Sequence, residues 1–266
     1  MSLRAEMRQD LLYALDPARW AVDAVGFRPD DWQSAVLQDP AHRVALNITR
    51  QGGKSTIAAI KALHTAIYWS RSLTLLLAPS QRQSNELFRK VTGFREDLEN
   101  PPELIEDNKL SCTLANRSRI VALPGSDGTI RGFSAPRLVI ADEASRIPDV
   151  VYAAVSPMLA VSGGSLMLLS TPFGKRGKFY RVMTEPGGYW STYTVPASQV
   201  ARISHAFLDE EHDDLLDWEY QQEYECQFVD LEAGLSIFNP DDWKTALNDQ
   251  VTPYTFLRLQ QEATTI

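Results

Sequence analysis

The sequence predicts an α/β fold with a mainly parallel central sheet, and two observations predict it. Short aliphatic runs that end at Gly, Pro or Ser alternate with segments whose apolar residues recur at helical spacing. The chain has 266 residues, of which 44% are hydrophobic and 23% charged, and this suits one large domain with an appendage. Alternating strands and helices of this kind are typical of units with right-handed crossovers.

The expected strands are aliphatic along their whole length, which is typical of strands buried on both faces of a parallel sheet. They lie at residues 44–48, 73–78, 138–141 and 166–170, with a further strand at 120–123. The expected helices lie at residues 56–70, 81–99 and 150–159. From residue 206 charge becomes dense, and residues 213–229 are expected to form a helical, aromatic stretch. We therefore predict a core over residues 1–200, a small subdomain over 201–240 and a linker or tail over 241–266.

Several classes of protein are disfavoured by composition. The chain has no apolar run long enough to span a membrane and no apolar signal core at its start. Cys112 and Cys226 lie far apart, and the four histidines form no metal-binding spacing. A net charge of −8 argues against indiscriminate coating of nucleic acid, so we expect any DNA contact to be local.

A phosphate-binding loop is predicted between the first expected strand and the first expected helix. The segment reads Asn47-Ile48-Thr49-Arg50-Gln51-Gly52-Gly53-Lys54-Ser55-Thr56. In such a loop backbone N–H groups point at phosphate oxygens, Lys54 reaches the β and γ phosphates, and Ser55 binds Mg²⁺. The full pattern has glycine at the position of Ile48, so an accidental or structural match stays an alternative.

Two adjacent carboxylates follow the expected strand at residues 138–141. In a P-loop ATPase the aspartate at this position, here Asp142, holds Mg²⁺, and the neighbouring glutamate, here Glu143, polarises the attacking water. On its own the pair would equally fit a helix start, where carboxylates favour the helix dipole. Downstream of the phosphate-binding loop, the catalytic interpretation is the one that we adopt.

These motifs resemble those of the large terminase subunit, the ATP-driven DNA-packaging motor of tailed phages. That family's phosphate loop typically lacks the first glycine and carries an arginine, as this one carries Arg50. Residues 27–33 are similar to its adenine-reading motif, in which Gln33 matches the base-contacting glutamine. Alternatively, Gln33 simply belongs to an amphipathic helix.

Three further segments resemble family motifs in the expected order. Residues 168–174 resemble the coupling motif, a strand end beside the γ-phosphate that includes Thr171. Residues 125–134 resemble the segment that supplies an arginine, here Arg131, and residues 218–228 resemble the lid helix. The alternatives are an ordinary strand exit at Thr171, a surface arginine paired with Asp127, and core packing for the aromatic residues of the lid.

The resemblance implies a RecA/ASCE-type P-loop NTPase fold with a small lid subdomain, and ATP with Mg²⁺ as cofactors. The implied catalytic residues are Glu143, Arg131, Lys54 and Arg50. The implied nucleotide-binding residues are Gln33, Thr49, Gln51, Gly52, Gly53, Lys54, Ser55, Thr56 and Thr171. The implied metal ligands are Ser55 and Asp142.

The implied function is ATP hydrolysis that drives translocation of double-stranded viral DNA into a procapsid, in the cytoplasm of the bacterial host. The implied partners are double-stranded DNA, the portal protein, the small terminase subunit and further copies of the chain in a ring, with a monomer as the alternative state in isolation. Because too little chain follows residue 240 for the family's nuclease domain, we expect no DNA cleavage. The alternatives are a superfamily 2 helicase-like DNA-dependent ATPase, which needs a second RecA-like domain, and a non-enzymatic nucleotide-binding scaffold, which would usually lack the glutamate.

Overall fold

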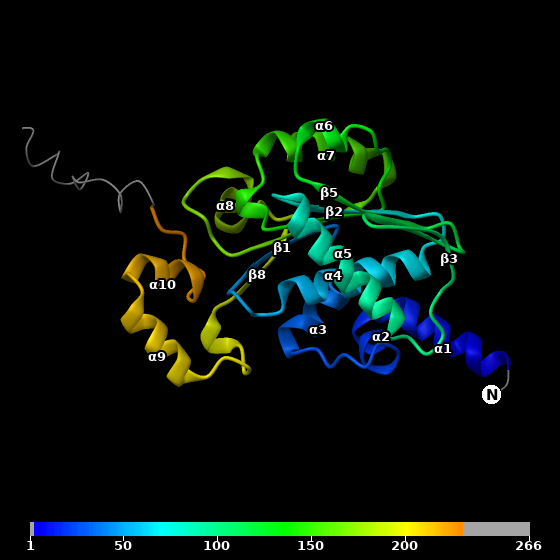
Figure 1. Ribbon diagram of the computed structural model, residues 1–266, viewed down its shortest axis with the longest axis horizontal. Helices are drawn as coiled ribbons and strands as arrows, with labels where there is room; N and C mark the ends of the chain where they lie inside the picture. The colour runs from blue at the N-terminus through cyan, green and yellow to red at the C-terminus, as the bar shows by residue number, and fades with distance from the viewer. Residues whose placement is uncertain (1–2, 231–266) are drawn as a thin grey trace, which may run out of the picture. The chain divides into compact units, whose positions relative to one another are not determined.

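Eight strands form one mixed sheet in the order β3-β4-β5-β2-β6-β7-β1-β8, with helices on both of its faces (Figure 1). The computed structural model describes residues 3–230, and residues Met1–Val229 form one compact unit separate from Asp230–Ile266. The expected tail at residues 241–266, and residues 231–240 of the expected lid, lie outside the described residues. The strands are β1 (Arg43–Ile48), β2 (Leu73–Ala78), β3 (Leu104–Asn108), β4 (Ser111–Leu114), β5 (Arg119–Pro124), β6 (Leu138–Asp142), β7 (Ser165–Ser170) and β8 (Ser191–Val195).

Five neighbouring strand pairs are parallel and two are antiparallel. Strand β1 runs parallel to β7 and β8, β2 runs parallel to β5 and β6, and β6 runs parallel to β7. The antiparallel pairs are β3 with β4 and β4 with β5, at one end of the sheet. The expected α/β fold with a mainly parallel sheet is therefore confirmed.

The order of the central strands brings the predicted motifs to one edge of the sheet. Strand β7 lies between β1 and β6, so the strand that precedes the phosphate-binding loop does not adjoin the strand that ends in the acidic pair. Parallel strands share the direction of their carboxyl ends, and ligands of open α/β sheets bind there. The ends of β1, β6 and β7 therefore meet where a nucleotide would bind.

Two hydrophobic clusters fill the two faces of the sheet. Alternate residues of β1 face opposite clusters: Leu46 and Ile48 pack with α3, α4 and α5, whereas Ala45 packs with α7 and α8. Figure 1 shows α3, α4 and α5 on one side of the strands and α6, α7 and α8 on the other. The helices are α1 (Leu3–Leu15), α2 (Pro17–Asp23), α3 (Asp31–Gln38), α4 (Lys54–Tyr68), α5 (Gln81–Glu96), α6 (Asp127–Ile130), α7 (Asp149–Ser162), α8 (Gly177–Thr184), α9 (His205–Asp214) and α10 (Asp217–Glu223), with short 3₁₀ turns η1 (Ala144–Arg146) and η2 (Ala197–Gln199).

The helical stretch expected over residues 213–229 is wrong in extent. Helix α9 ends at Asp214, and α10 covers only Asp217–Glu223. The two residues between them are extended, with ψ of 158° at Leu215 and 145° at Leu216. Carboxylates at the end of α9 oppose its dipole, which favours termination there. Every strand expected from the sequence is present, whereas β3, β4 and β8 were not expected.

Candidate nucleotide-binding site

The backbone of the loop between β1 and α4 favours glycine at two positions, Gly52 and Gly53. Gly53 has a φ of +94°, a conformation that side chains with a Cβ rarely adopt. A Cβ on Gly52 would lie 2.6 Å from Cγ2 of Ile48 and 3.1 Å from the carbonyl oxygen of Thr49. Ile48, which stands where the full motif has glycine, is fully buried at the end of β1 and packs beneath Gly52. The departure from the motif is thus accommodated by the core.

The loop brings Lys54 and Ser55 against the acidic pair. Nζ of Lys54 lies 3.4 Å from Oε1 of Glu143, and the two side chains are only 10% and 24% exposed. The Ser55 hydroxyl donates to Oδ2 of Asp142 at 3.1 Å. Helix α4 begins at Lys54, so its N-terminal N–H groups face the same place. Four side chains predicted from two distant motifs therefore form one cluster.

The two carboxylates occupy different environments. Asp142 is buried at the end of β6, and burial followed by the neighbouring charge of Glu143 raises the pKa of Asp142 above its usual range, against the lowering effect of Lys54 and Ser55. Glu143 is less buried and has a φ of 52°, which is uncommon for a residue with a side chain. This turn directs the glutamate away from the strand, toward Lys54.

Ser170, rather than Thr171, connects the end of β7 to the glutamate. The Ser170 hydroxyl lies 3.5 Å from Oε2 of Glu143 and 2.7 Å from the hydroxyl of Ser145, whose N–H also donates to it. Thr171 is buried beside it and is not among the residues that line the cavity described below. Residues of the expected coupling motif thus lie beside Glu143, and within that motif it is Ser170 that makes the contact.

A cavity of about 580 Å³ opens beside the phosphate-binding loop. Its lining contains Phe27, Arg28, Gln33, Arg50, Gln51, Gly53, Lys54, Ser55, Thr56, Lys90 and Arg202. Gln33 is buried there, and its Oε1 accepts the backbone N–H of Asp30 at 2.9 Å at the start of α3. Gln33 therefore belongs to helix α3 and also lines the cavity, and its contact with a base stays a prediction.

The residues that precede the two glycines contact the end of α10 and the segment that follows it. The Thr49 hydroxyl and the Arg50 N–H both donate to the carbonyl oxygen of Glu223, at 2.9 and 3.4 Å. Nε of Arg50 lies 2.8 Å from Oε2 of Glu223, in ion-pair contact without hydrogen-bond geometry. Asn47 similarly donates to the carbonyl oxygen of Cys226 at 2.7 Å. The phosphate-binding loop is thus tied to the end of the expected lid helix.

Sequence reasoning missed two residues that the structure brings to the site. Ser145 is linked to Glu143 through Ser170, a residue of the expected coupling motif, and Arg202 donates to the carbonyl oxygen of Gly52. Arg202 belongs to no recognisable sequence motif. Its contact with Gly52 joins residues 150 positions apart, so no local pattern in the sequence marks it. Arg131, by contrast, is exposed at the end of α6.

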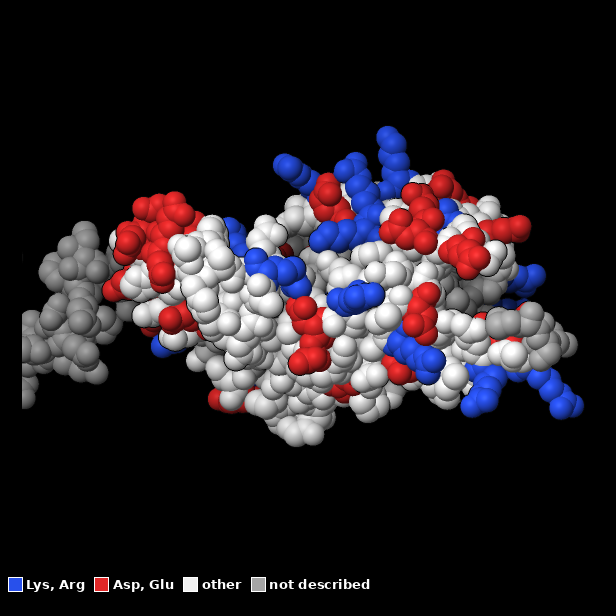
Figure 2. All heavy atoms as spheres, turned by 90° about the horizontal axis from the view of Figure 1, so that it is seen from below, with Lys and Arg blue, Asp and Glu red and all other residues white. Residues whose placement is uncertain are grey.

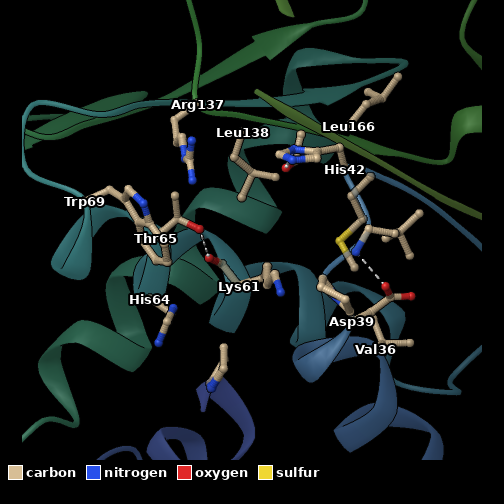
Figure 3. A pocket seen from close by; sticks show the side chains of 16 residues that line it. Val36, Asp39, His42, Lys61, His64, Thr65, Trp69, Arg137, Leu138 and Leu166 are labelled. Atoms are coloured by element: carbon tan, nitrogen blue, oxygen red, sulfur yellow. Dashed lines mark hydrogen bonds between the residues drawn. The ribbon is translucent and has the colours of Figure 1, made fainter. Parts of the chain in front are cut away.

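A second cavity, of about 200 Å³, lies at the opposite edge of the sheet, where β1, β6 and β7 begin (Figure 3). Its polar groups are used within the chain. Nζ of Lys61 donates to the carbonyl oxygen of Leu37 at 2.7 Å, and Nε2 of His64 lies 2.8 Å from the carbonyl oxygen of Tyr13. These contacts tie α4 to α3 and α1, and the cavity shares no lining residue with the one beside the phosphate-binding loop.

The donor set at the loop fits Mg²⁺ better than a transition metal. Among residues 3–230 there is no cluster of three or more His, Cys, Asp or Glu side chains arranged to hold a metal ion. Magnesium commonly takes one or two protein oxygens and completes its shell with water and phosphate, and Ser55 with Asp142 offers such a pair. Within the same residues, no helix has the length and apolar character to cross a membrane.

Comparisons with known proteins indicate one family. Residues 46–245 match the family model described as "Terminase large subunit, T4likevirus-type, N-terminal". The large terminase subunit of Thermus phage G20c is 28% identical over 179 residues, which cover 60% of this chain and 37% of that protein. The chain therefore spans little more than a third of the length of this relative.

Solved structures show the same fold. Two structures of the ATPase domain of the large terminase of Thermus phage P74-26 have TM-scores of 0.73 and 0.70 at 22% identity, covering 81% of this chain and all of that domain. The large terminase of the thermophilic bacteriophage D6E, solved in complex with ATP-gamma-S, has a TM-score of 0.58 at 12% identity over 81% of this chain and 52% of that chain.

Proposed function

The chain belongs to the large terminase subunit family, and on that premise we propose that it hydrolyses ATP to drive double-stranded viral DNA into a procapsid. The observation that carries the proposal is the meeting of Lys54 and Ser55 with Asp142 and Glu143 at the carboxyl edge of the sheet. A phosphate-binding loop alone serves many nucleotide-binding proteins. The nearby glutamate adds a group able to activate water.

The roles of the side chains follow from their positions. Lys54 donates to the β and γ phosphates, since it begins α4 where the helix dipole also favours negative charge. Its ammonium group leaves Glu143 when phosphate arrives, and Glu143 is then available to orient the attacking water. Ser170, which is bonded to Ser145, contacts the glutamate from the end of β7.

Ser55 and Asp142 would hold Mg²⁺, which when bound neutralises phosphate charge in the transition state. Asp142 fits this role because burial and a like charge disfavour its ionised form, and a cation beside it reverses that preference. Arg50 would contact the γ-phosphate only after leaving Glu223. The D6E terminase was solved with ATP-gamma-S, which supports a nucleoside triphosphate as the ligand of this fold.

The helicase alternative is less well supported. Superfamily 2 helicases close two RecA-like domains over ATP, whereas the eight-stranded sheet of residues 3–230 has the fold of a terminase ATPase domain. The scaffold alternative does not explain Glu143, which is placed beside Lys54 by an uncommon backbone conformation. The family match and these two observations together favour the packaging motor.

The expected partners are double-stranded DNA, the portal protein, the small terminase subunit and further copies of the chain. Figure 2 shows basic and acidic side chains interspersed over much of one face, with acidic side chains gathered over α9 on the left of this view. Like charges repel the DNA backbone, so α9 is an unsuitable DNA surface. Local contact with DNA stays an expectation from the net charge of −8, and α9 is not a candidate surface for it.

Substitution of Lys54 tests the proposal. In Lys54→Ala we expect ATP turnover to fall by at least about 10²-fold, because a donor aimed at transition-state charge is lost. The exposed Lys109, in the turn between β3 and β4, provides the control Lys109→Ala. Phosphate release measures turnover, and thermal unfolding confirms that both variants are folded. Wild-type turnover in a folded Lys54→Ala variant would contradict the assignment of the site.

A further inference from the structure

Arg202 joins three segments that are far apart in the sequence. It lies in the turn between η2 and α9, and its side chain is 50% exposed. Its Nη2 donates to the carbonyl oxygen of Gly52 at 3.0 Å, and its Nη1 donates to Oδ2 of Asp30 at 2.8 Å. Because one planar guanidinium makes both contacts, it fixes the position of the loop carbonyl relative to the start of α3.

The contact with Gly52 determines which way the next N–H group points. The carbonyl of Gly52 and the N–H of Gly53 belong to one peptide group, and in a trans peptide they project to opposite sides. Arg202 lies close against this peptide, since its Nη2 is 3.3 Å from the position that a Cβ on Gly53 would take. With the carbonyl turned toward Arg202, the N–H turns away from it, so that it can serve as one of the loop's donors to phosphate.

A second side chain supports the loop from the same direction. Nε2 of Gln33 is 2.7 Å from the position that a Cβ on Gly53 would take, and Oε1 of Gln33 accepts the N–H of Asp30. Asp30 is therefore held twice, by its backbone through Gln33 and by its carboxylate through Arg202. The contacts form a closed ring around the outside of the loop.

We propose that Arg202 is a positioning residue of the nucleotide site, which holds the Gly52–Gly53 peptide in its phosphate-binding orientation and couples it to Asp30. The inference rests on the proposed ATPase function and deepens it. Arg202 acts through the loop, whereas Lys54 and Glu143 are the groups placed for the chemical step. Its loss therefore weakens binding of the phosphates and leaves the chemical step nearly unchanged.

The test separates phosphate binding from base binding and from catalysis. In Arg202→Ala we expect KM for ATP to rise about tenfold, the effect of losing a charge-assisted hydrogen bond, while kcat changes less than about twofold. Magnesium tripolyphosphate, which has no base or ribose, serves as the second probe, and its affinity falls by the same factor. Arg202→Lys restores little, because an ammonium cannot make both contacts as a planar fork does.

A matched control is available at Arg19, which pairs with Asp23 on α2 at 3.3 Å with side chains 56% and 39% exposed, against 50% and 32% for Arg202 and Asp30. Arg19→Ala should leave both affinities unchanged. A second variant, Asp30→Ala, should also weaken tripolyphosphate binding. The double variant should bind tripolyphosphate no more weakly than the single variant with the lower affinity, because both changes break the same set of contacts.

Three outcomes would overturn the inference. Unchanged affinity for both ligands would show that the ring does not shape the loop. A loss for ATP alone would show that Arg202 reads the base or ribose directly, and a loss of kcat at constant KM would make it a catalytic residue. Failure of the proposed function would appear differently, as absent ATP turnover in the wild-type protein itself.

Discussion

At the scale of single residues, the two adjacent carboxylates differ in their surroundings, and we therefore propose different roles for them. Asp142 ends a buried strand and accepts from Ser55, whereas Glu143 adopts a φ of 52° and meets Lys54. Neither distinction is visible in the sequence, where the pair is simply Asp followed by Glu. The sequence did locate both, because an aliphatic run ending in carboxylates is a strong local pattern.

Substitutions that neutralise one or the other carboxylate should therefore have different effects on nucleotide binding and hydrolysis. Glu143→Gln keeps the size of the side chain and removes its basicity, so we expect it to bind Mg-ATP within about threefold of wild type and to hydrolyse it about 10² to 10⁴ times more slowly. Asp142→Asn should weaken nucleotide binding and its dependence on Mg²⁺ together.

Equilibrium binding of a fluorescent ATP analogue across a Mg²⁺ titration, with single-turnover hydrolysis, measures both effects. Equal losses of ATP affinity in the two variants would show that their roles are misassigned. Ser170→Ala is an informative companion, because it removes a neighbour of Glu143 without changing charge.

At the scale of elements, the central strands and helices were predictable and the outer ones were not. Strands β1, β2, β6 and β7 are buried along nearly their whole length, so an unbroken aliphatic run marks each of them. Strand β8, at the end of the sheet, alternates between partly buried and exposed residues up to the buried Val195, and its other four side chains all carry hydroxyl groups. Its pairing with β1 is set by tertiary contact, which no local pattern records.

Helix α4 contains a titratable group whose burial links folding to pH. His64 is 1% exposed and packs edge-on against Trp20, and burial, assisted by the positive charge of Lys61, lowers the pKa of His64 from 6.5 to about 4, against the raising effects of Tyr13 and Asp16. The unfolded chain binds this proton near pH 6.5 and the folded chain does not. Stability is therefore fully present above pH 6.5 and is lost as the pH falls toward 4.

The loss attributable to His64 should be on the order of 3 kcal/mol across that window. His64→Gln removes the titration while keeping a donor able to reach the carbonyl of Tyr13. Urea unfolding at pH 7 and pH 4.5 should show a smaller decrease in unfolding free energy for His64→Gln than for the wild-type protein. Equal decreases in the two proteins would mean that other groups govern acid sensitivity. Figure 3 shows His64 beside Lys61 and Thr65 at the second cavity. Because the lowered pKa leaves His64 neutral at pH 7, His64→Gln does not change the charge of this cavity at that pH.

At the scale of the whole molecule, the site is assembled from pieces that no single motif contains. The loop after β1 meets the end of β6, the start of α3 and the end of α10, and Glu143 meets Ser170 at the end of β7. The strand ends and the start of α3 were predictable, because each carries a motif and parallel strands place their carboxyl ends at one edge of the sheet. The contacts of Glu223 and Arg202 with the loop could not be predicted, because they depend on how the last described helices return to the sheet.

The last prediction concerns cooperation between copies of the chain. Arg131 is exposed at the end of α6 and is not among the residues that line its own nucleotide cavity. We propose that in a ring it reaches the ATP of a neighbouring subunit, where an arginine that stabilises charge on the γ-phosphate contributes on the order of 10³ to 10⁵ in rate. Arg131→Ala alone should then be nearly inactive under assembling conditions.

Mixing variants tests this directly. A ring of Arg131→Ala and Lys54→Ala subunits can place an intact phosphate loop beside an intact arginine, so we expect turnover to recover on mixing. Lys54→Ala mixed with Glu143→Gln is the matched control, because both changes disable a subunit's own site and no neighbour can supply the missing group. Recovery in the first mixture alone supports action between subunits. Full activity of Arg131→Ala by itself would refute any catalytic role, and inactivity of both mixtures would confine Arg131 to its own subunit.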